Sequence, residues 1–220
     1  MATETRQRMI ETAARLFQRD GYCATSWRSL VSEAGTPWGS IHHHFPGGKE
    51  ELGLAAVNAG SDAVAALIEH CFSDGPDAPS AIARWFALSA ELLMNSAYTA
   101  GCPVATLALE TATSSQTMHQ ATKRAFDRWQ DLLAAELRKA GAAPSDAYEA
   151  AATVLVLLEG GLLLARVQAA PRALHLAGVQ AVAVTRAGLG SEAAQAPSQA
   201  LLDLEKDRSE DNLAIGGPDR

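Results

Sequence analysis

The segment from residue 25 to residue 52 constrains the fold of this chain most strongly, because it contains the end signals of one short helix and the start signals of another. Its first apolar residues recur at i, i+3, i+4 and i+7: Trp27, Leu30, Val31 and Ala34. This spacing predicts an apolar stripe on a short helix, with Ser26 as its N-cap. Gly35 is expected to end the helix, because glycine enters the left-handed conformation at little cost.

A second helix is expected to follow at once. Thr36 is a suitable capping residue, and Pro37 suits the first position of a helix. We expect this helix to run over about 37–43, short enough to lie in the major groove of DNA, with Phe45 as an apolar anchor and a stop at 46–48. The pattern predicts a helix-turn-helix.

The remaining sequence predicts an all-α protein. Apolar residues make up 48% of the chain, enough for a core, and there is no convincing alternation of apolar and polar residues that would indicate strands. Helical patterns outside the helix-turn-helix are expected at about 5–19, 49–73, 80–96, a short segment through 110, 116–140, 144–165 and 171–189.

These patterns predict an N-terminal three-helix DNA-binding domain over 1–49, a helical-bundle ligand-binding and dimerisation domain over 50–190, and a mobile tail over 191–220. The two helices nearest the end of the bundle are apolar almost all round, so a partner subunit is expected to cover them in a homodimer. The residues predicted at the dimer interface are Leu155, Leu158, Leu162, Val179 and Val182.

The charge is unevenly distributed. The net charge is −7, yet residues 1–49 carry six Lys and Arg against four Asp and Glu, so a DNA contact by this part is compatible with the composition. No apolar run is long enough to span a bilayer, and no basic-then-apolar leader is recognised. We therefore expect a cytoplasmic protein without a membrane partner, associated with the nucleoid when bound to DNA.

Neither a metal site nor a cofactor is expected. The three cysteines are widely spaced and form no CxxC motif: Cys23, Cys71 and Cys102. The three consecutive histidines, His42, His43 and His44, point about 100° apart on a helix, so they cannot all face one ion.

The helix-turn-helix segment resembles the N-terminal domain of TetR-type transcriptional repressors. The matching positions, in order, are Gly21, Tyr22, Thr25, Ser26, Ala34, Gly35, Gly39, His44, Phe45, Lys49 and Glu50. The sequence departs from that pattern at His42, which replaces a tyrosine, at an additional glycine within 46–49, and at Trp38, a large residue on the expected groove face.

The resemblance and groove chemistry together predict the DNA contacts. The candidates for base edges and neighbouring phosphates are Trp38, Gly39, His42 and His43. The residues expected to position the DNA backbone are Thr25, Ser26, Arg28, Thr36, Ser40 and Lys49, and Pro37 belongs to the same predicted surface.

A second motif lies in the bundle. The residues of 101–104 (Gly-Cys-Pro-Val) followed by 107–110 (Leu-Ala-Leu-Glu) resemble the C-terminal domain of the LmrA/YxaF-type branch of these repressors. That resemblance implies a small apolar or aromatic inducer. The predicted ligand residues are Trp85, Leu92, Cys102, Thr106, Glu110, Met118, Phe126 and Trp129, although aromatic residues at helical spacing also serve as core. Glu110 is a candidate for a ligand or interface contact, and the role of Glu159 stays open.

The combined interpretation is a dimeric, ligand-responsive repressor that binds a palindromic operator in double-stranded DNA and is not an enzyme. Paired carboxylates with a nearby base, a nucleophile elbow and a phosphate-binding glycine loop are not found in the sequence. The alternative is a small-molecule carrier or an enzyme built on a repressor scaffold.

Overall fold

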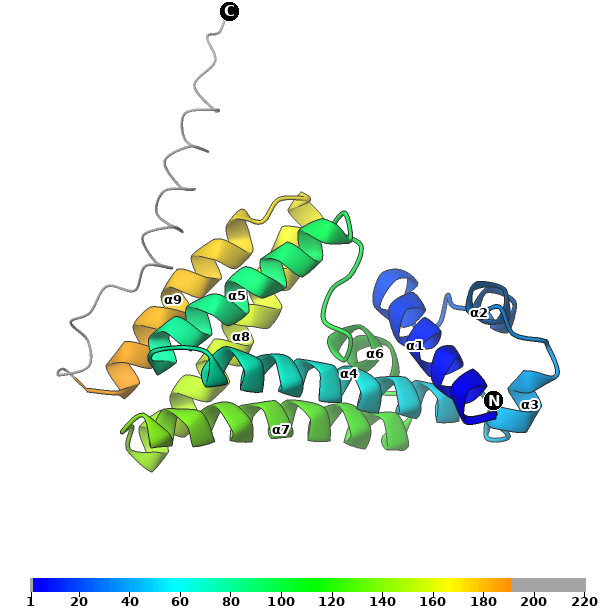
Figure 1. Ribbon diagram of the computed structural model, residues 1–220, viewed down its shortest axis with the longest axis horizontal. Helices are drawn as coiled ribbons and strands as arrows, with labels where there is room; N and C mark the ends of the chain where they lie inside the picture. Colours follow the sequence, from blue (N-terminus) through cyan, green and yellow to red (C-terminus); the bar gives the residue numbers. More distant parts are fainter. Residues whose placement is uncertain (1, 191–220) are drawn as a thin grey trace, which may run out of the picture.

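The computed structural model describes residues 2–190, and over this range the chain is built from helices without strands (Figure 1). The helices are α1 (Ala2–Asp20), α2 (Trp27–Ala34), α3 (Ser40–His44), α4 (Gly48–Ser73), α5 (Ala78–Asn95), α6 (Ala105–Thr111), α7 (Gln116–Lys139), α8 (Pro144–Gln168) and α9 (Arg172–Gly188). The predicted all-α class is confirmed. The tail predicted at 191–220 lies outside the described residues.

Helix α2 begins and ends as its local sequence predicts. The side-chain oxygen of Ser26 accepts a hydrogen bond from the backbone N–H of Ser29 at 3.1 Å, which satisfies one of the free donors of the first turn. Gly35 has φ of +60° and ψ of +39°, the left-handed conformation that ends a helix. Both signals act on backbone groups a few residues away, so the packing of the rest of the chain does not change them.

Helix α3 begins at Ser40, which corrects the predicted start at Pro37. Residues 37–39 form a turn in which the N–H of Ser40 donates to the Pro37 carbonyl at 3.0 Å and that of Ile41 to the Trp38 carbonyl at 3.2 Å. Thr36 does not cap the helix, because its side chain is buried and its hydroxyl oxygen has no hydrogen-bond partner among the described residues.

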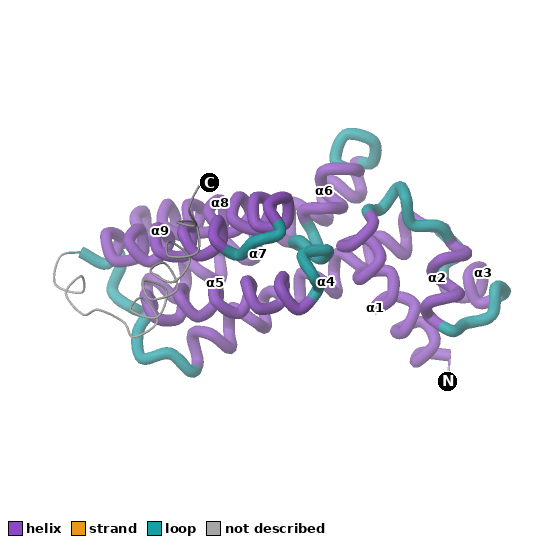
Figure 2. The backbone as a smooth tube through the Cα atoms, turned by 90° about the horizontal axis from the view of Figure 1, so that it is seen from above, coloured by secondary structure: helices purple, strands orange, loops and turns teal. Residues whose placement is uncertain are grey.

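Helix α4 connects the two parts of the molecule. One of its ends lies against α1, and its other end lies between α5 and α7 (Figures 1 and 2). The Trp129 indole on α7 donates to the Ser61 carbonyl of α4 at 3.0 Å, and Arg128 forms an ion pair with Asp62 one residue further along α4. We call α1 to α3 the head and α5 to α9 the body. Helix α4 therefore contacts both the head and the body.

Helices α8 and α9 pack on each other through small residues. A Cβ atom at Gly161 would lie 2.9 Å from a Leu174 methyl carbon, so glycine permits the close approach of the two helices. Helices α4 and α8 are long and apolar enough, by length and composition alone, to cross a bilayer, but both pack against other helices of the chain. The outward side of α8 nevertheless carries exposed apolar residues: Val156, Leu163, Leu164 and Val167.

The structure places the five residues predicted at the dimer interface in two different environments. Leu155, Leu158 and Val182 are buried inside the single chain, because their side of α8 and α9 packs onto the rest of the body. Leu162 and Val179 are partly exposed. On α8, the exposed apolar residues lie on the opposite side from Leu155 and Leu158.

Candidate nucleic-acid interface and ligand cavity

The turn before α3 and the exposed side of α3 form a continuous candidate surface for DNA. Pro37, Trp38, Gly39, His42 and His43 are all exposed, and Trp38 presents 56% of its surface although it is one of the largest apolar side chains in the chain. No atom outside its neighbours approaches the Cβ position of Gly39 within 4 Å, so the backbone is open there. An exposed indole beside open backbone and two imidazoles can contact base edges and phosphates.

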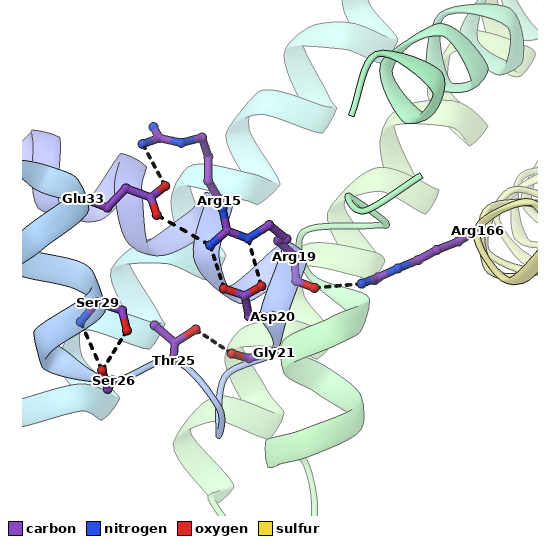
Figure 3. Close-up of polar contacts among 9 residues, drawn as sticks. All are labelled: Arg15, Arg19, Asp20, Gly21, Thr25, Ser26, Ser29, Glu33 and Arg166. Atoms are coloured by element: carbon purple, nitrogen blue, oxygen red, sulfur yellow. Dashed lines mark hydrogen bonds and ion pairs between the residues drawn. The ribbon is translucent and has the colours of Figure 1, made fainter. Parts of the chain in front are cut away.

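The residues predicted to position the DNA backbone fall into two groups. Ser26 and Arg28 are exposed, and Ser40 is half-buried. Thr25 and Thr36 are buried, and the hydroxyl of Thr25 donates to the Gly21 carbonyl at 2.7 Å, closing the loop between α1 and α2 (Figure 3). The structure thus gives Thr25 a role inside the head.

Lys49 lies against the loop between α1 and α2. Its ammonium nitrogen is 4.7 Å from the ring centroid of Tyr22 and donates to the Cys23 carbonyl at 3.4 Å. Burial lowers the pKa of this ammonium group. The N–H of Gly47 just before α4 donates to the Glu51 carboxylate at 2.9 Å, so this helix start already has an anionic partner. The phosphate contact of Lys49 stays a prediction.

Arginines on α1 form ion pairs that connect α1 to α2. Arg19 contacts Asp20 at 2.8 Å and Glu33 at 3.5 Å, and Arg15 lies 3.8 Å from Glu33 (Figure 3). These surface pairs orient α2 relative to α1 more than they stabilise the fold. Within residues 2–190, no three His, Cys, Asp or Glu side chains are placed to hold one metal ion.

Two charged residues of the body hold the backbone of the head from opposite sides of residue 21. The Glu110 carboxylate on α6 accepts hydrogen bonds from the N–H groups of Tyr22 at 3.1 Å and Cys23 at 2.6 Å. The Arg166 guanidinium on α8 donates to the Gln18 carbonyl at 3.3 Å, near the C-terminal end of α1. It also donates to the Arg19 carbonyl at 2.8 Å (Figure 3). An anion therefore faces free N–H groups, and a cation faces free carbonyls.

We call these four hydrogen bonds the head clamp. A fifth contact supports it, since the Gln18 side-chain amide donates to the Gly101 carbonyl in the turn before α6. Sequence reasoning identified Glu110 as a ligand or interface candidate but did not identify Arg166. The available signal for Arg166 was a lone basic residue near the end of the apolar 150–168 segment.

The same two residues line a pocket of about 570 Å³ in the body. Its lining is mostly apolar and comes from the turn before α6, α6 itself, α7 and α8: Gly101, Cys102, Ala105, Thr106, Ala108, Leu109, Glu110, Phe126, Glu159, Gly160, Leu162, Leu163 and Arg166. We call it the large pocket. Of the predicted ligand residues, Cys102, Thr106, Glu110 and Phe126 lie on its wall.

A smaller pocket of about 110 Å³ adjoins it, with Gly101, Cys102, Glu159 and Leu162 in the lining of both. The predicted ligand residues Trp85, Leu92 and Trp129 line this small pocket. Met118 lines neither pocket. It is buried on α7 beside Gly53 of α4. A Cβ atom at Gly53 would lie 3.2 Å from the terminal methyl group of Met118 and would also meet the Tyr22 ring.

Two family models match this sequence. Residues 9–56 match bacterial regulatory proteins of the tetR family, and residues 78–180 match the C-terminal domain of LmrA/YxaF-like transcriptional regulators. The first match covers the helix-turn-helix with its surrounding helices, and the second covers the whole lining of the large pocket and most of that of the small pocket. The fold is therefore that of a helix-turn-helix regulator.

Individual relatives agree. The HTH-type regulators YxaF and LmrA of Bacillus subtilis are each 34% identical over 161 residues, which is 73% of this chain and 84% and 86% of those proteins. A TetR regulator from Legionella pneumophila superposes with a TM-score of 0.71 at 27% identity over 79% of this chain and 93% of that one. A regulatory protein TetR from Rhodobacter sphaeroides has the same fold, with a TM-score of 0.73 at 24% identity over 81% and 97% of the two chains.

The chain belongs to the TetR family of transcriptional regulators. Within it, the bundle is of the LmrA/YxaF-like type, as the motif around Cys102 indicated.

Proposed function

We propose that this regulator is a ligand-responsive repressor that binds a palindromic operator in double-stranded DNA as a homodimer in the cytoplasm. The observation that carries the proposal is that Glu110 and Arg166 belong both to the head clamp and to the wall of the large pocket. A molecule in that pocket contacts the groups that hold the head.

The coupling follows from the positions of these contacts. The head clamp holds residues 18–23, which end α1 and lead into α2. A ligand that displaces either charged group changes how this segment is held and so changes the orientation of α2 and α3. Release of DNA then requires only that the ligand bind the DNA-incompetent arrangement more tightly.

An apolar stripe on α8 supports the dimer. Val156, Gly160, Leu163 and Val167 follow one another at i, i+4, i+7 and i+11, and all four are exposed. A second copy related by a two-fold axis would bury this stripe and present two heads to successive major grooves. Gly160 and Leu163 also line the large pocket, so the same copy would cover part of its open side.

The test is selection of bound duplexes from a random DNA library, followed by titration of binding against salt. The expected result is a palindrome whose binding weakens as salt rises, because cations on the head displace counterions from the phosphates. Recovery of nothing above background would contradict the proposal and favour a carrier of small molecules. Turnover of a bound compound would favour an enzyme on a repressor scaffold.

A further inference from the structure

Glu159 on α8 is an acid that neither the packing of the body nor the head clamp accounts for. Its side-chain atom Oε1 is fully buried and has no hydrogen-bond partner among the described residues. The Cys102 thiol interacts with the carboxyl group, and burial raises the pKa of Glu159 above its ordinary value of 4.5. A buried acceptor without a partner costs free energy, so its retention requires another explanation.

The position of Glu159 supplies one. It lies in the part of the lining that the small and large pockets share. The other charged residues of the large pocket, Glu110 and Arg166, are already hydrogen-bonded to the head. Among the charged residues of the two linings, within residues 2–190, Glu159 is therefore the one with a fully buried polar atom that has no hydrogen-bond partner.

The small pocket suits a cation. Besides Glu159, it is lined by the indoles of Trp85 and Trp129, each 1% exposed. The ring nitrogen of Trp129 already donates to the Ser61 carbonyl, so what this indole adds to the lining is aromatic rather than hydrogen-bonding. Aromatic faces and a desolvated carboxylate both attract a positive charge, and they attract it more strongly where water is excluded.

The large pocket suits the rest of such a ligand. It is about five times larger and is lined mainly by aliphatic groups with Phe126, which favours an apolar or aromatic body. We infer that the inducer is a monocationic compound whose ammonium group pairs with Glu159 in the small pocket and whose apolar body occupies the large pocket. This inference rests on the proposed function for its regulatory meaning and on the two pockets for its chemistry.

The charge arrangement distinguishes this class from others. A ligand carboxylate would place a second anion against Glu159, and a neutral hydrocarbon would leave Oε1 unpaired. An ammonium group supplies both the donor and the opposite charge. Glu159 thus selects for the charge of the ligand, and the apolar walls of the pockets select for its shape.

The test is direct binding of matched aromatic probes to the full chain, measured by calorimetry. The probes are naphthalene, anthracene and pyrene carrying an aminomethyl, a methyl or a carboxylate substituent. At least one amine is expected to bind about tenfold more tightly than its methyl partner, as a charge-assisted hydrogen bond implies, and the carboxylates are expected to bind most weakly. Equal binding across a set, preference for the methyl or carboxylate probe, or no binding by any probe would overturn the inference.

Two variants locate the effect. Glu159→Gln keeps the side-chain shape and removes the charge, so it should abolish the preference for the amine over the methyl probe. Glu149→Gln, an exposed acid on the same helix, should preserve the preference. An unchanged preference in Glu159→Gln would overturn the assignment to this residue.

The two proposals can fail separately. If a palindrome is recovered from the DNA library but the amine probes bind no more tightly than the others, the proposed repressor is supported and the proposed ligand class is contradicted. If the amine probes bind preferentially but no DNA sequence is selected, the ligand class is supported and the repressor function is contradicted.

Discussion

The carboxylate of Glu110 on α6 occupies the space that a Cβ atom at Gly21 would need, so the glycine and the acid depend on each other. Gly21 has φ of +93°, a backbone conformation that side chains disfavour, and this turn directs the next two N–H groups to the Glu110 oxygens. Local backbone geometry in the head is thereby matched to a side chain 89 positions later in the chain.

The first prediction concerns this pair. Gly21→Ala should lower the free energy of unfolding by more than the roughly 1–2 kcal/mol expected for a left-handed alanine, because its methyl group would also displace the Glu110 carboxylate from its two hydrogen bonds. Gly35 also has a positive φ, +60°, but the space around its Cβ position is open. Gly35→Ala should therefore show the backbone cost alone. Denaturant unfolding measures both variants.

A double-mutant cycle isolates the collision. The double variant, Gly21→Ala with Glu110→Ala, should lose less free energy of unfolding than the sum of the losses in the two single variants. The difference should be about 0.5 kcal/mol or more, as expected for residues in contact. Strict additivity would show that the two residues do not interact.

The second prediction concerns the hydrogen bonds of Glu110. In Glu110→Ala, the N–H groups of Tyr22 and Cys23 lose their acceptors, so their hydrogen exchange should accelerate by about five- to tenfold, corresponding to a bond worth about 1 kcal/mol. The N–H of Ser29, which donates to Ser26, is the internal control and should keep its rate. Unchanged exchange at Tyr22 and Cys23 would show that the head is held in another way.

The third prediction separates base from phosphate contacts. Trp38→Ala should change the preferred bases recovered in DNA selection, because its exposed indole lies on the predicted groove surface. Arg28→Ala should weaken binding to all sequences alike and reduce the salt slope by about 0.9, the value for one phosphate contact. Identical behaviour of both variants on operator and random DNA would contradict the assignment.

The fourth prediction concerns pH. Burial raises the pKa of Glu159, so the folded state binds this proton more tightly than the unfolded state, and stability from this group is lost as pH rises above 4.5 through the raised pKa. Glu159→Gln should therefore gain in Tm relative to the original chain between pH 4 and pH 8, by a few degrees where 1 kcal/mol corresponds to about 2–4 °C. Calorimetric unfolding at several pH values measures the difference, with Glu149→Gln for comparison. A difference in Tm that falls with rising pH would contradict the assigned direction.

The fifth prediction concerns the dimer. Val156 and Val167 are 71% and 74% exposed on the α8 stripe, so Val156→Glu with Val167→Glu should place two charges in each half of the interface and yield monomers by sedimentation velocity. Operator affinity should fall with the loss of the second head. Met94→Glu changes an exposed apolar residue on α5 and should remain dimeric. A dimeric α8 variant would place the interface elsewhere.

The helix-turn-helix shows how far local sequence reaches. Ser26 and Gly35 act on backbone groups within three or four residues, so their roles were predictable and are observed. Thr36 followed by Pro37 contains equally good start signals, yet α3 begins at Ser40, because the Thr36 side chain is buried in the folded head. A cap requires an accessible hydroxyl, and accessibility is not a local property.

The body shows the same division. Its motif around Cys102 indicated the type of bundle, and most of the predicted ligand residues line a pocket. Periodicity also showed that α8 is apolar almost all round, but not which side faces the core: Leu155 and Leu158 are inside, and Val156 is outside. For such a helix, the neighbouring helices that pack on it determine which side is buried.

The sequence by itself determined the all-α class, the family and the ends of α2, because helical periodicity and the Ser26 cap depend on residues a few positions apart. Only the tertiary structure decided that Glu110 and Arg166 hold the head and line a pocket, and that Glu159 has an unpaired oxygen. Hydrogen bonds between residues 88 and 147 positions apart depend on how α4 and α8 bring head and body together, and that arrangement results from the packing of all the helices.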